Sequence, residues 1–302
     1  MTRWPRLAAA LGAALALLVL VWARSAYKAR QSPPGGGWAA VDYEPLRLAV
    51  QAYARSRPQR FGIYFRDLVS GLEWGYQPDE PIPAASTVKV PIALYVNQLV
   101  ADGRLSWSDR IIYRRELDLA PGAGVLQYQG VDGQGYTLRV LTNLLITISD
   151  NVAWRMLERE LGRDNIAAFM RRLGGRTVYP DGKNITTARD MGTYLAAVLD
   201  FARRHPALGE RLLDDLSHTI WDVGLSGLLP AGVRVAHKEG EISGVADDVG
   251  IVFARRPYIL CILSEEVQDL NAGFQDIARI SRMVFDFQKE LPAGPSSGSS
   301  GT

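Results

Sequence analysis

The order of strand-like and helix-like segments most limits how this chain can fold. Two strand-like runs, FGIYFRDL and GLEWGY, stand near its beginning, and three more, VRVAHKEG, DVGIVFAR and YILCILSEE, stand near its end. Turn residues join neighbouring runs closely, so we expect those neighbours to pair antiparallel. Most of the sequence between the two groups has the periodicity of amphipathic or buried helices.

Helices are predicted before, between and after the two groups of strands. They cover residues 45–55, 86–101, 137–148, 152–161, 165–173, 187–204, 208–216 and 271–290. The simplest packing is an α/β fold of the α+β type, in which the first and last helices flank one five-stranded antiparallel sheet. The remaining helices form an inserted all-helical lobe over about residues 86–220. A cleft between sheet and lobe would be a usual place for a functional site.

The N-terminal segment favours attachment to a membrane. Residues 7–22, LAAALGAALALLVLVW, carry no charge, and basic residues flank them on both sides. This run is slightly shorter than the roughly 17–25 residues of most membrane spans. The possible cleavage site after it is poor, and the basic residues on its far side favour an uncleaved anchor. We therefore predict a signal anchor over residues 1–30 that holds the domain outside the cytoplasm, or a secreted protein if residues 1–25 are removed.

The other predicted boundaries follow from local composition. Residues 31–40 are rich in Pro and Gly and read as a linker, and residues 292–302 read as a disordered tail. The catalytic domain is then expected over residues 41–291.

Composition excludes several classes of function. The chain has 34 basic and 32 acidic residues, with no basic run and no zinc-ligand spacing, so nucleic-acid binding is not expected. The three histidines are too scattered for a metal site. The single cysteine, Cys261, lies in the apolar run YILCIL and is predicted to be a buried core residue.

Ser86 and Lys89 form a Ser-x-x-Lys pattern at the start of a predicted helix. Residues three apart on a helix share a face, so the amine can reach the hydroxyl. A serine hydroxyl needs a base within hydrogen-bond reach, which makes the pair a candidate nucleophile and base. The alternative is a helix cap beside a solvated lysine. Pro91 opposes the carbonyl of Thr87, which predicts an irregular first turn.

Two further short motifs could complete such a site. Ser149-Asp150-Asn151 lies at the junction of two apolar helices, where these residue types could cap a helix or could present a hydroxyl and an amide to a cleft. Lys238-Glu239-Gly240 lies in a predicted strand, which could equally be a surface strand of alternating charge.

Together the three motifs resemble Ser-x-x-Lys, Ser-Asp-Asn and Lys-Thr-Gly of the penicillin-recognising serine enzymes, in the same order. The succession of elements over about residues 40–290 is similar to that of the class A β-lactamases, and TTARDM, residues 186–191, resembles the segment after that family's omega loop. The resemblance implies a serine hydrolase that works through an acyl-enzyme without a metal or cofactor. Its substrate would be a small-molecule β-lactam or a peptidoglycan-type peptide.

The resemblance also implies catalytic roles. Ser86 would be the acylated nucleophile and Lys89 its base. Ser149 would pass a proton to the leaving nitrogen, with electrostatic support from Lys238. Two lysines converging on one site would lower each other's pKa, which helps Lys89 to act as a base.

The remaining matching residues would bind the substrate. Asn151 would orient the substrate amide and the base. Glu239 and Gly240 would border the substrate, and the backbone N–H groups of Ser86 and Glu241 would form the oxyanion hole.

The first departure from the family concerns deacylation. Class A β-lactamases carry a glutamate on the omega loop that activates the deacylating water. The matching interval here, GGRTVYPDGKN at residues 174–184, is short and contains no glutamate, and Asp181 is its only carboxylate. We therefore expect slow or absent deacylation.

The second departure is Glu239, which stands where the family has Thr or Ser. An ionised glutamate would repel a substrate carboxylate by about 4 kcal/mol at roughly 4 Å and an effective dielectric constant of about 20. Alternatively, Glu239 pairs with His237 or turns to solvent.

Three functions therefore remain open on the sequence. The chain is a β-lactamase-like hydrolase of β-lactam or related amide bonds, a D,D-peptidase-like enzyme that acts on peptidoglycan peptides, or a non-catalytic module that binds or senses the cell wall. The five side chains of Ser86, Lys89, Ser149, Asn151 and Lys238 favour an enzyme, whereas Glu239 and the missing glutamate favour the module.

Overall fold

The computed structural model describes residues 41–293. Contacts divide the chain into two units, residues 1–42 with 70–72, and residues 43–69 with 73–302. The second unit contains every helix and strand given below.

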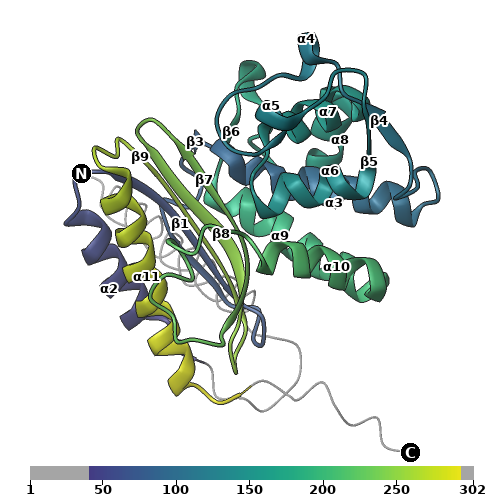
Figure 1. The fold of residues 1–302 in the computed structure, drawn as a ribbon. Coiled ribbons are helices and arrows are strands. Elements are labelled where there is room, and N and C mark those ends of the chain that lie inside the picture. The colour runs from purple at the N-terminus through teal and green to yellow at the C-terminus, as the bar shows by residue number, and fades with distance from the viewer. Residues whose placement is uncertain (1–40, 294–302) are drawn as a thin grey trace, which may run out of the picture. The chain divides into compact units, whose positions relative to one another are not determined.

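A five-stranded antiparallel sheet forms the centre of this unit, with strand order β2-β1-β9-β8-β7 (Figure 1). Its strands are β1 Arg60–Asp67, β2 Glu73–Tyr76, β7 Arg234–Ile242, β8 Val245–Phe253 and β9 Tyr258–Glu265. β8 and β9 are buried along almost their whole length. Helices cover both faces of the sheet, which explains why β9 reads as a continuous apolar run rather than as an alternating one.

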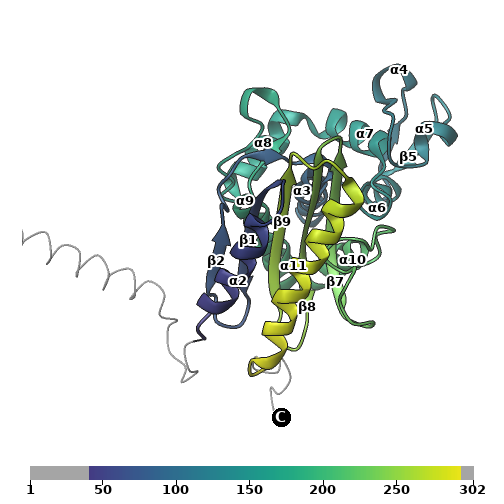
Figure 2. The same ribbon diagram turned by 90° about the vertical axis from the view of Figure 1, so that its left-hand side faces the viewer.

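Two helices cover one face of the sheet, namely α2 Glu44–Arg55 and α11 Leu270–Glu290 (Figure 2). Both are strongly amphipathic, and α11 packs on β8 and β9 while α2 packs on β2 and α11. The prediction that the first and last helices flank the sheet is confirmed.

The helical lobe lies on the opposite face, as Figure 1 shows. Its elements are the 3₁₀ turn η1 Ala85–Val88, α3 Lys89–Ala101, α4 Arg115–Asp118, α5 Leu126–Gln129, α6 Leu138–Thr147, α7 Asn151–Leu161, α8 Arg163–Arg172, the 3₁₀ turn η2 Pro180–Gly182, α9 Ala188–Arg204 and α10 Pro206–Ser217. α9 joins the layers because it contacts β1, β8 and β9. α3 packs against α6, α8, α9 and α10, and a helix in that central position is apolar on all sides.

Two details differ from the sequence prediction. The segment predicted as one helix over residues 86–101 begins as η1 and becomes α-helical only at Lys89, which agrees with the irregular turn expected from Pro91. Two short strand pairs were not predicted, because two or three residues give no periodic signal. They are β3 Ile82–Pro83 with β6 Ile185–Thr186, and β4 Arg110–Ile112 with β5 Gly135–Thr137.

Cys261 is buried in β9, as predicted. Among residues 41–293, no helix is both long enough and apolar enough to cross a membrane. The predicted anchor and linker lie outside the described residues, as does most of the predicted tail.

A buried ion pair ties the end of β1 to the turn before β9. The Arg256 guanidinium donates to both carboxylate oxygens of Asp67, with Nη2 2.5 Å from Oδ2, and both side chains are buried. We predict that Asp67→Ala lowers the free energy of unfolding by about 3–5 kcal/mol, because it leaves a buried cation uncompensated. Urea unfolding measures this loss. Glu44→Ala, which removes an exposed pair with Arg47, is the control and should cause no measurable change. A loss for Asp67→Ala no larger than the control's would contradict the prediction.

Candidate active site

Ser86 lies in the 3₁₀ turn η1 at the N-terminal end of α3. Side chains three apart are eclipsed in a 3₁₀ turn, so Ser86 and Lys89 face the same way. The turn begins with a left-handed residue, Ala85 at φ 43°, a conformation that costs a non-glycine residue free energy. Asn184 holds Ala85 in this conformation. Its side-chain Nδ2 donates to Ala85 O at 2.8 Å, and its backbone carbonyl accepts from Ala84 N at 2.9 Å. Asn184 therefore positions the candidate nucleophile, a role that the sequence did not reveal.

The amine of Lys89 is the hub of the site and is wholly buried. Its Nζ lies 3.0 Å from Ser86 Oγ, 3.0 Å from Ser149 Oγ, 2.7 Å from Ser149 O and 2.8 Å from Asn151 Oδ1. The carbonyl and amide oxygens can only accept hydrogen bonds, whereas the two hydroxyls can also donate. A neutral amine satisfies this set, because its two N–H groups serve the two acceptors and its lone pair accepts from a serine hydroxyl.

Burial and charge both favour that neutral amine. Burial lowers the pKa of Lys89, the nearby Lys238 ammonium lowers it further, and the result is about 7. Glu239 and Asp150 act in the opposite direction and keep the pKa from falling lower.

The Ser149-Asp150-Asn151 motif serves as a helix cap and as part of the site at once. Asp150 is the N-cap of α7, where its Oδ1 accepts from Ala153 N at 2.9 Å. Ser149, at φ 58°, and Asn151 lie on either side of it and both contact Lys89. The helix-cap interpretation is confirmed for Asp150, while the catalytic roles of Ser149 and Asn151 stay predictions.

The glycine-containing loop over residues 120–129 packs directly on this motif. Asp150 Oδ2 accepts from Val125 N at 2.7 Å, and Asn151 Nδ2 donates to Pro121 O at 2.8 Å. Gly124, at φ 101°, approaches so closely that a Cβ there would lie 2.3 Å from Asp150 Cγ. The loop thus holds the motif in place. It binds the amide nitrogen of Asn151, while the amide oxygen of the same side chain contacts Lys89.

The third motif lies on β7 at the open edge of the sheet, and it is not a surface strand. Lys238 is wholly buried, and its Nζ donates to Glu239 O at 3.0 Å and to Glu239 Oε1. Glu239 is 6% exposed. It therefore neither turns to solvent nor forms its hydrogen bond with His237, and both of those interpretations are wrong.

Gly240 brings β7 against the nucleophile turn. A Cβ added at this residue would lie 3.1 Å from Ser86 N, so no larger residue fits without movement of the turn. Glu241 follows on the same strand with an exposed side chain. The use of its N–H in an oxyanion hole stays a prediction.

A second buried charge cluster lies one residue before Lys238. His237 Nδ1 lies 3.0 Å from Asp248 Oδ1, and its Nε2 lies 3.7 Å from Asp222 Oδ1. Burial alone would lower the pKa of His237, but the charge of Asp248 and the nearby Asp222 carboxylate raise it to about 10. His237 is thus protonated at neutral pH and balances Asp248.

The segment that stands in place of the omega loop brings no carboxylate into the structure's interior. Asp181 is exposed, and the neighbouring Tyr179 is buried with the Arg163 guanidinium 4.5 Å from its ring centre. Among residues 41–293, no three His, Cys, Asp or Glu side chains are grouped as a metal site.

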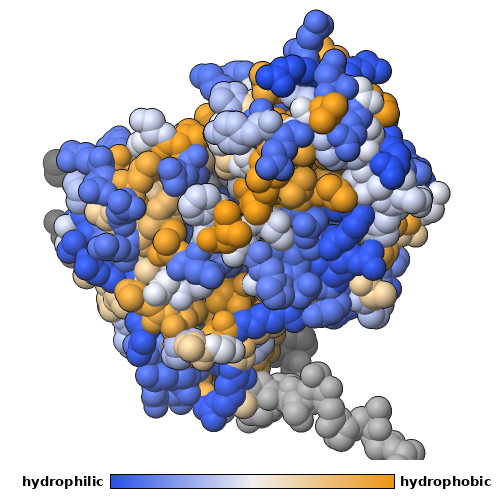
Figure 3. Space-filling model, in the orientation of Figure 1, coloured by the Kyte–Doolittle hydropathy of each residue, from blue (hydrophilic) through white to orange (hydrophobic). Residues whose placement is uncertain are grey.

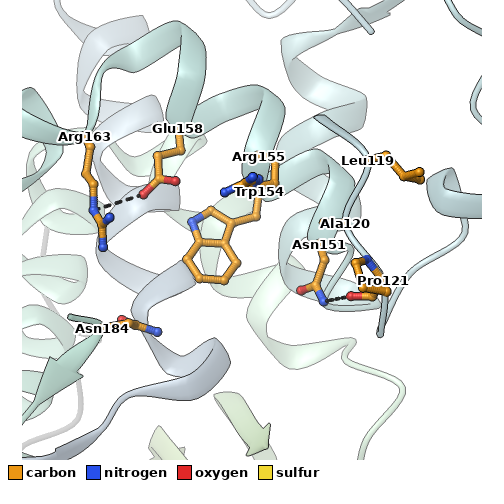
Figure 4. A pocket seen from close by; sticks show the side chains of 9 residues that line it. All are labelled: Leu119, Ala120, Pro121, Asn151, Trp154, Arg155, Glu158, Arg163 and Asn184. Atoms are coloured by element: carbon orange, nitrogen blue, oxygen red, sulfur yellow. Dashed lines mark hydrogen bonds and ion pairs between the residues drawn. The ribbon is translucent and has the colours of Figure 1, made fainter. Parts of the chain in front are cut away.

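A pocket of about 320 Å³ adjoins the site at Asn151 (Figure 4). It is lined by Leu119, Ala120, Pro121, Asn151, Trp154, Arg155, Glu158, Arg163 and Asn184. Its single lining carboxylate, Glu158, is paired with Arg163 at 3.6 Å between Oε1 and Nε. The pocket reaches the site because Asn151 contacts Lys89 and Asn184 holds the nucleophile turn.

Apolar side chains gather across the middle of the face shown in Figure 3, from the sheet to the helical lobe. Segments that contact the motifs contribute exposed apolar residues. They are Val125 of the loop on Asp150, Ile220, Trp221 and Val223 between α10 and β7, and Ile242 at the end of β7. A substrate with an apolar portion is compatible with such a surface.

Comparisons with known proteins agree with this geometry. The model of the β-lactamase enzyme family matches residues 45–288. A β-lactamase of Streptomyces albus G is 28% identical over 307 residues, which is 94% of each protein. The solved structure of PBP-A has a TM-score of 0.77 at 30% identity and covers 82% of this chain and 97% of its own.

Two further structures bear on the chemistry. A β-lactamase from Sphaerobacter thermophilus has a TM-score of 0.74 at 28% identity, over 83% of this chain and 100% of its own. The L158E mutant of PBP-A, 31% identical with a TM-score of 0.76 over 82% of this chain and 97% of its own, was solved as an acyl-enzyme complex with penicillin G. With the matching family model and the fold shared with these enzymes, the chain belongs to the β-lactamase enzyme family and is a serine hydrolase of the β-lactamase type.

Proposed function

We propose that compounds with a β-lactam or related amide bond acylate Ser86 and that the acyl-enzyme is long-lived. The observation that carries this proposal is the buried Lys89 amine, whose Nζ lies 3.0 Å from both the Ser86 and the Ser149 hydroxyls. A binding module has no need for a base poised between two hydroxyls.

Acylation uses the contacts of Lys89 with the Ser86 and Ser149 hydroxyls. Neutral Lys89 takes the proton of Ser86 as its Oγ attacks the substrate carbonyl carbon. The backbone N–H groups of Ser86 and Glu241 bind the developing oxyanion. As the C–N bond breaks, the Ser149 hydroxyl gives its proton to the leaving nitrogen and regains one from Lys89. The product is an ester between Ser86 and the acyl group.

Hydrolysis of that ester needs a base for the attacking water. Asp181, the only carboxylate in the segment that replaces the omega loop, is exposed, and Glu158 of the adjoining pocket is paired with Arg163, so neither one is a free base for that water. Slow deacylation follows. This also favours the second candidate, a D,D-peptidase-like enzyme on peptidoglycan peptides, in which the acyl group passes to another acceptor.

The location of the domain is a further part of the proposal. The uncharged run at residues 7–22 and its basic flanks support a membrane anchor. Both flanks are basic and set no orientation, so the proposal of a hydrolase domain outside the cytoplasm rests on the substrate class. A peptidoglycan-type substrate would be reached from that side of the membrane.

We predict a persistent covalent adduct with penicillin G. Intact mass spectrometry over several hours should show one added penicilloyl group on the wild-type protein, with little loss after the free drug is removed. Ser86→Ala should form none. Rapid return to the unmodified mass would contradict slow deacylation, and the absence of an adduct at any concentration would exclude β-lactam recognition.

The pH dependence of acylation tests the role of Lys89. Only a neutral amine accepts the Ser86 proton, so the rate should rise with pH through a midpoint of about 7 and level off above it. Glu239→Gln removes a negative charge that raises the pKa of Lys89, and the midpoint should move to lower pH.

The control is Glu210→Gln, which removes an exposed carboxylate paired with Arg234 at the other end of β7 and should leave the midpoint unchanged. A wild-type midpoint near the ordinary lysine pKa of 10.5 would rule out a neutral Lys89.

A further inference from the structure

Glu239 has an unsatisfied acceptor next to the candidate nucleophile. Its Oε1 accepts from Lys238 Nζ, but its Oε2 is buried and has no hydrogen-bond partner among the described residues. Glu239 directly precedes Gly240, whose Cα lies against the backbone of Ser86. Buried carboxylate oxygens without a donor are rare in native proteins, so this oxygen is available to a donor on a bound water or ligand.

The pairing of Lys238 with Glu239 also cancels the positive charge on β7 that would bind an anionic substrate group. Lys238 directs its ammonium to Glu239 O and to Glu239 Oε1. As an ammonium and a carboxylate in contact, the two side chains have no net charge together. Both side chains are buried, and separating them would leave a buried charge uncompensated, so they stay paired.

The other charged groups around β7 do not restore a free cation. His237 is balanced by Asp248 on β8 and by Asp222. Asp247, also on β8, is fully buried and accepts from Ser264 N at 2.9 Å. Lys89 is held by the oxygens of Ser86, Ser149 and Asn151. Arg234, at the other end of β7, is paired with Glu210 at 2.9 Å. Each of these described cations therefore has an acceptor as its partner, and Glu239 offers an acceptor rather than a charge that would bind an anion.

We propose that Glu239 is a specificity-determining residue, and that the part of the substrate that lies against β7 is an uncharged group with N–H donors, such as a carboxamide, rather than a carboxylate. This inference rests on the proposed acylation of Ser86. An N–H of that group would satisfy Oε2, whereas a carboxylate would bring a second negative charge to the same acceptor. Penicillin G carries a carboxylate, so its acylation of this protein should be slow.

Two isosteric thioesters test the proposal on the full-length protein. Both carry the same N-benzoylglycyl acyl group, and the leaving thiol is 3-mercaptopropionamide in one and 3-mercaptopropionate in the other. In each case Ser86 Oγ forms the ester bond, the C–S bond breaks, and the thiol leaves with the proton that Ser86 gave up. Thiol release gives the acylation rate, and intact mass identifies the adduct.

We expect the wild-type protein to be acylated at least tenfold faster by the carboxamide thioester. Glu239→Gln removes the negative charge and leaves the Lys238 cation unbalanced, so the carboxylate thioester should become the faster of the two. Glu239→Thr should shift the ratio in the same direction. Glu210→Gln, the exposed control, should keep the wild-type ratio.

The outcomes separate the inference from the proposed function. A wild-type protein that is acylated faster by the carboxylate thioester overturns the inference, while its adduct at Ser86 leaves the proposed function intact. A carboxamide preference that survives in both Glu239 variants overturns the role of Glu239. If neither thioester yields an adduct, the proposed function fails and the inference fails with it. The wild-type ratio needs no variant, so it decides even if a substitution at Glu239 prevents folding.

Discussion

The burial of one amine, that of Lys89, is the constraint on which the rest of the site depends. α3 carries this side chain into the middle of the helical lobe, where it is wholly enclosed. An ammonium there would be costly to desolvate, and the surrounding oxygens fit a neutral amine with two N–H donors and one lone pair. The 3₁₀ turn brings Ser86 to this amine, and the cap of α7 brings Ser149 and Asn151.

The edge of the sheet supplies the second half of the electrostatics. Lys238 lies close enough to lower the pKa of Lys89, yet its own charge is cancelled by Glu239. Lys89 is thus suited to take a proton, whereas Lys238 is not free to bind an anion. A PBP-A mutant of similar fold was solved as an acyl-enzyme with penicillin G. In a chain of the β-lactamase enzyme family, the proposal is therefore the same covalent chemistry with a different requirement for the leaving side of the substrate.

The fold and the main site residues were predictable from the sequence for physical reasons. Strand and helix periodicities are local, and the order of the elements left one economical packing, so the sheet and its flanking helices followed. Ser86, Lys89, Ser149, Asn151 and Lys238 were found because their motifs are short and keep their order. The structure brings Ser86, Ser149 and Asn151 each into hydrogen-bond contact with Lys89, and it places Lys238 within electrostatic reach of that amine.

Other features depend on contacts between distant residues and could not be predicted. Asn184 holds Ala85 across almost a hundred positions of sequence, and no local pattern marks it. Gly124 is required by its approach to Asp150, which only the folded loop reveals. The pairing of Glu239 with Lys238 was not predicted, because adjacent residues on a regular strand point to opposite faces, whereas these two long side chains contact each other at the open edge.

The most direct test of this account is the pKa of Lys89 itself. The chain contains only five lysines, so ¹³Cε-labelled lysine gives a simple NMR spectrum in which Lys89→Arg identifies the signal. Titration should show a midpoint of about 7 for Lys89. A midpoint near 10.5, the ordinary value for lysine, would mean that the amine is charged at neutral pH and would contradict its role as the base.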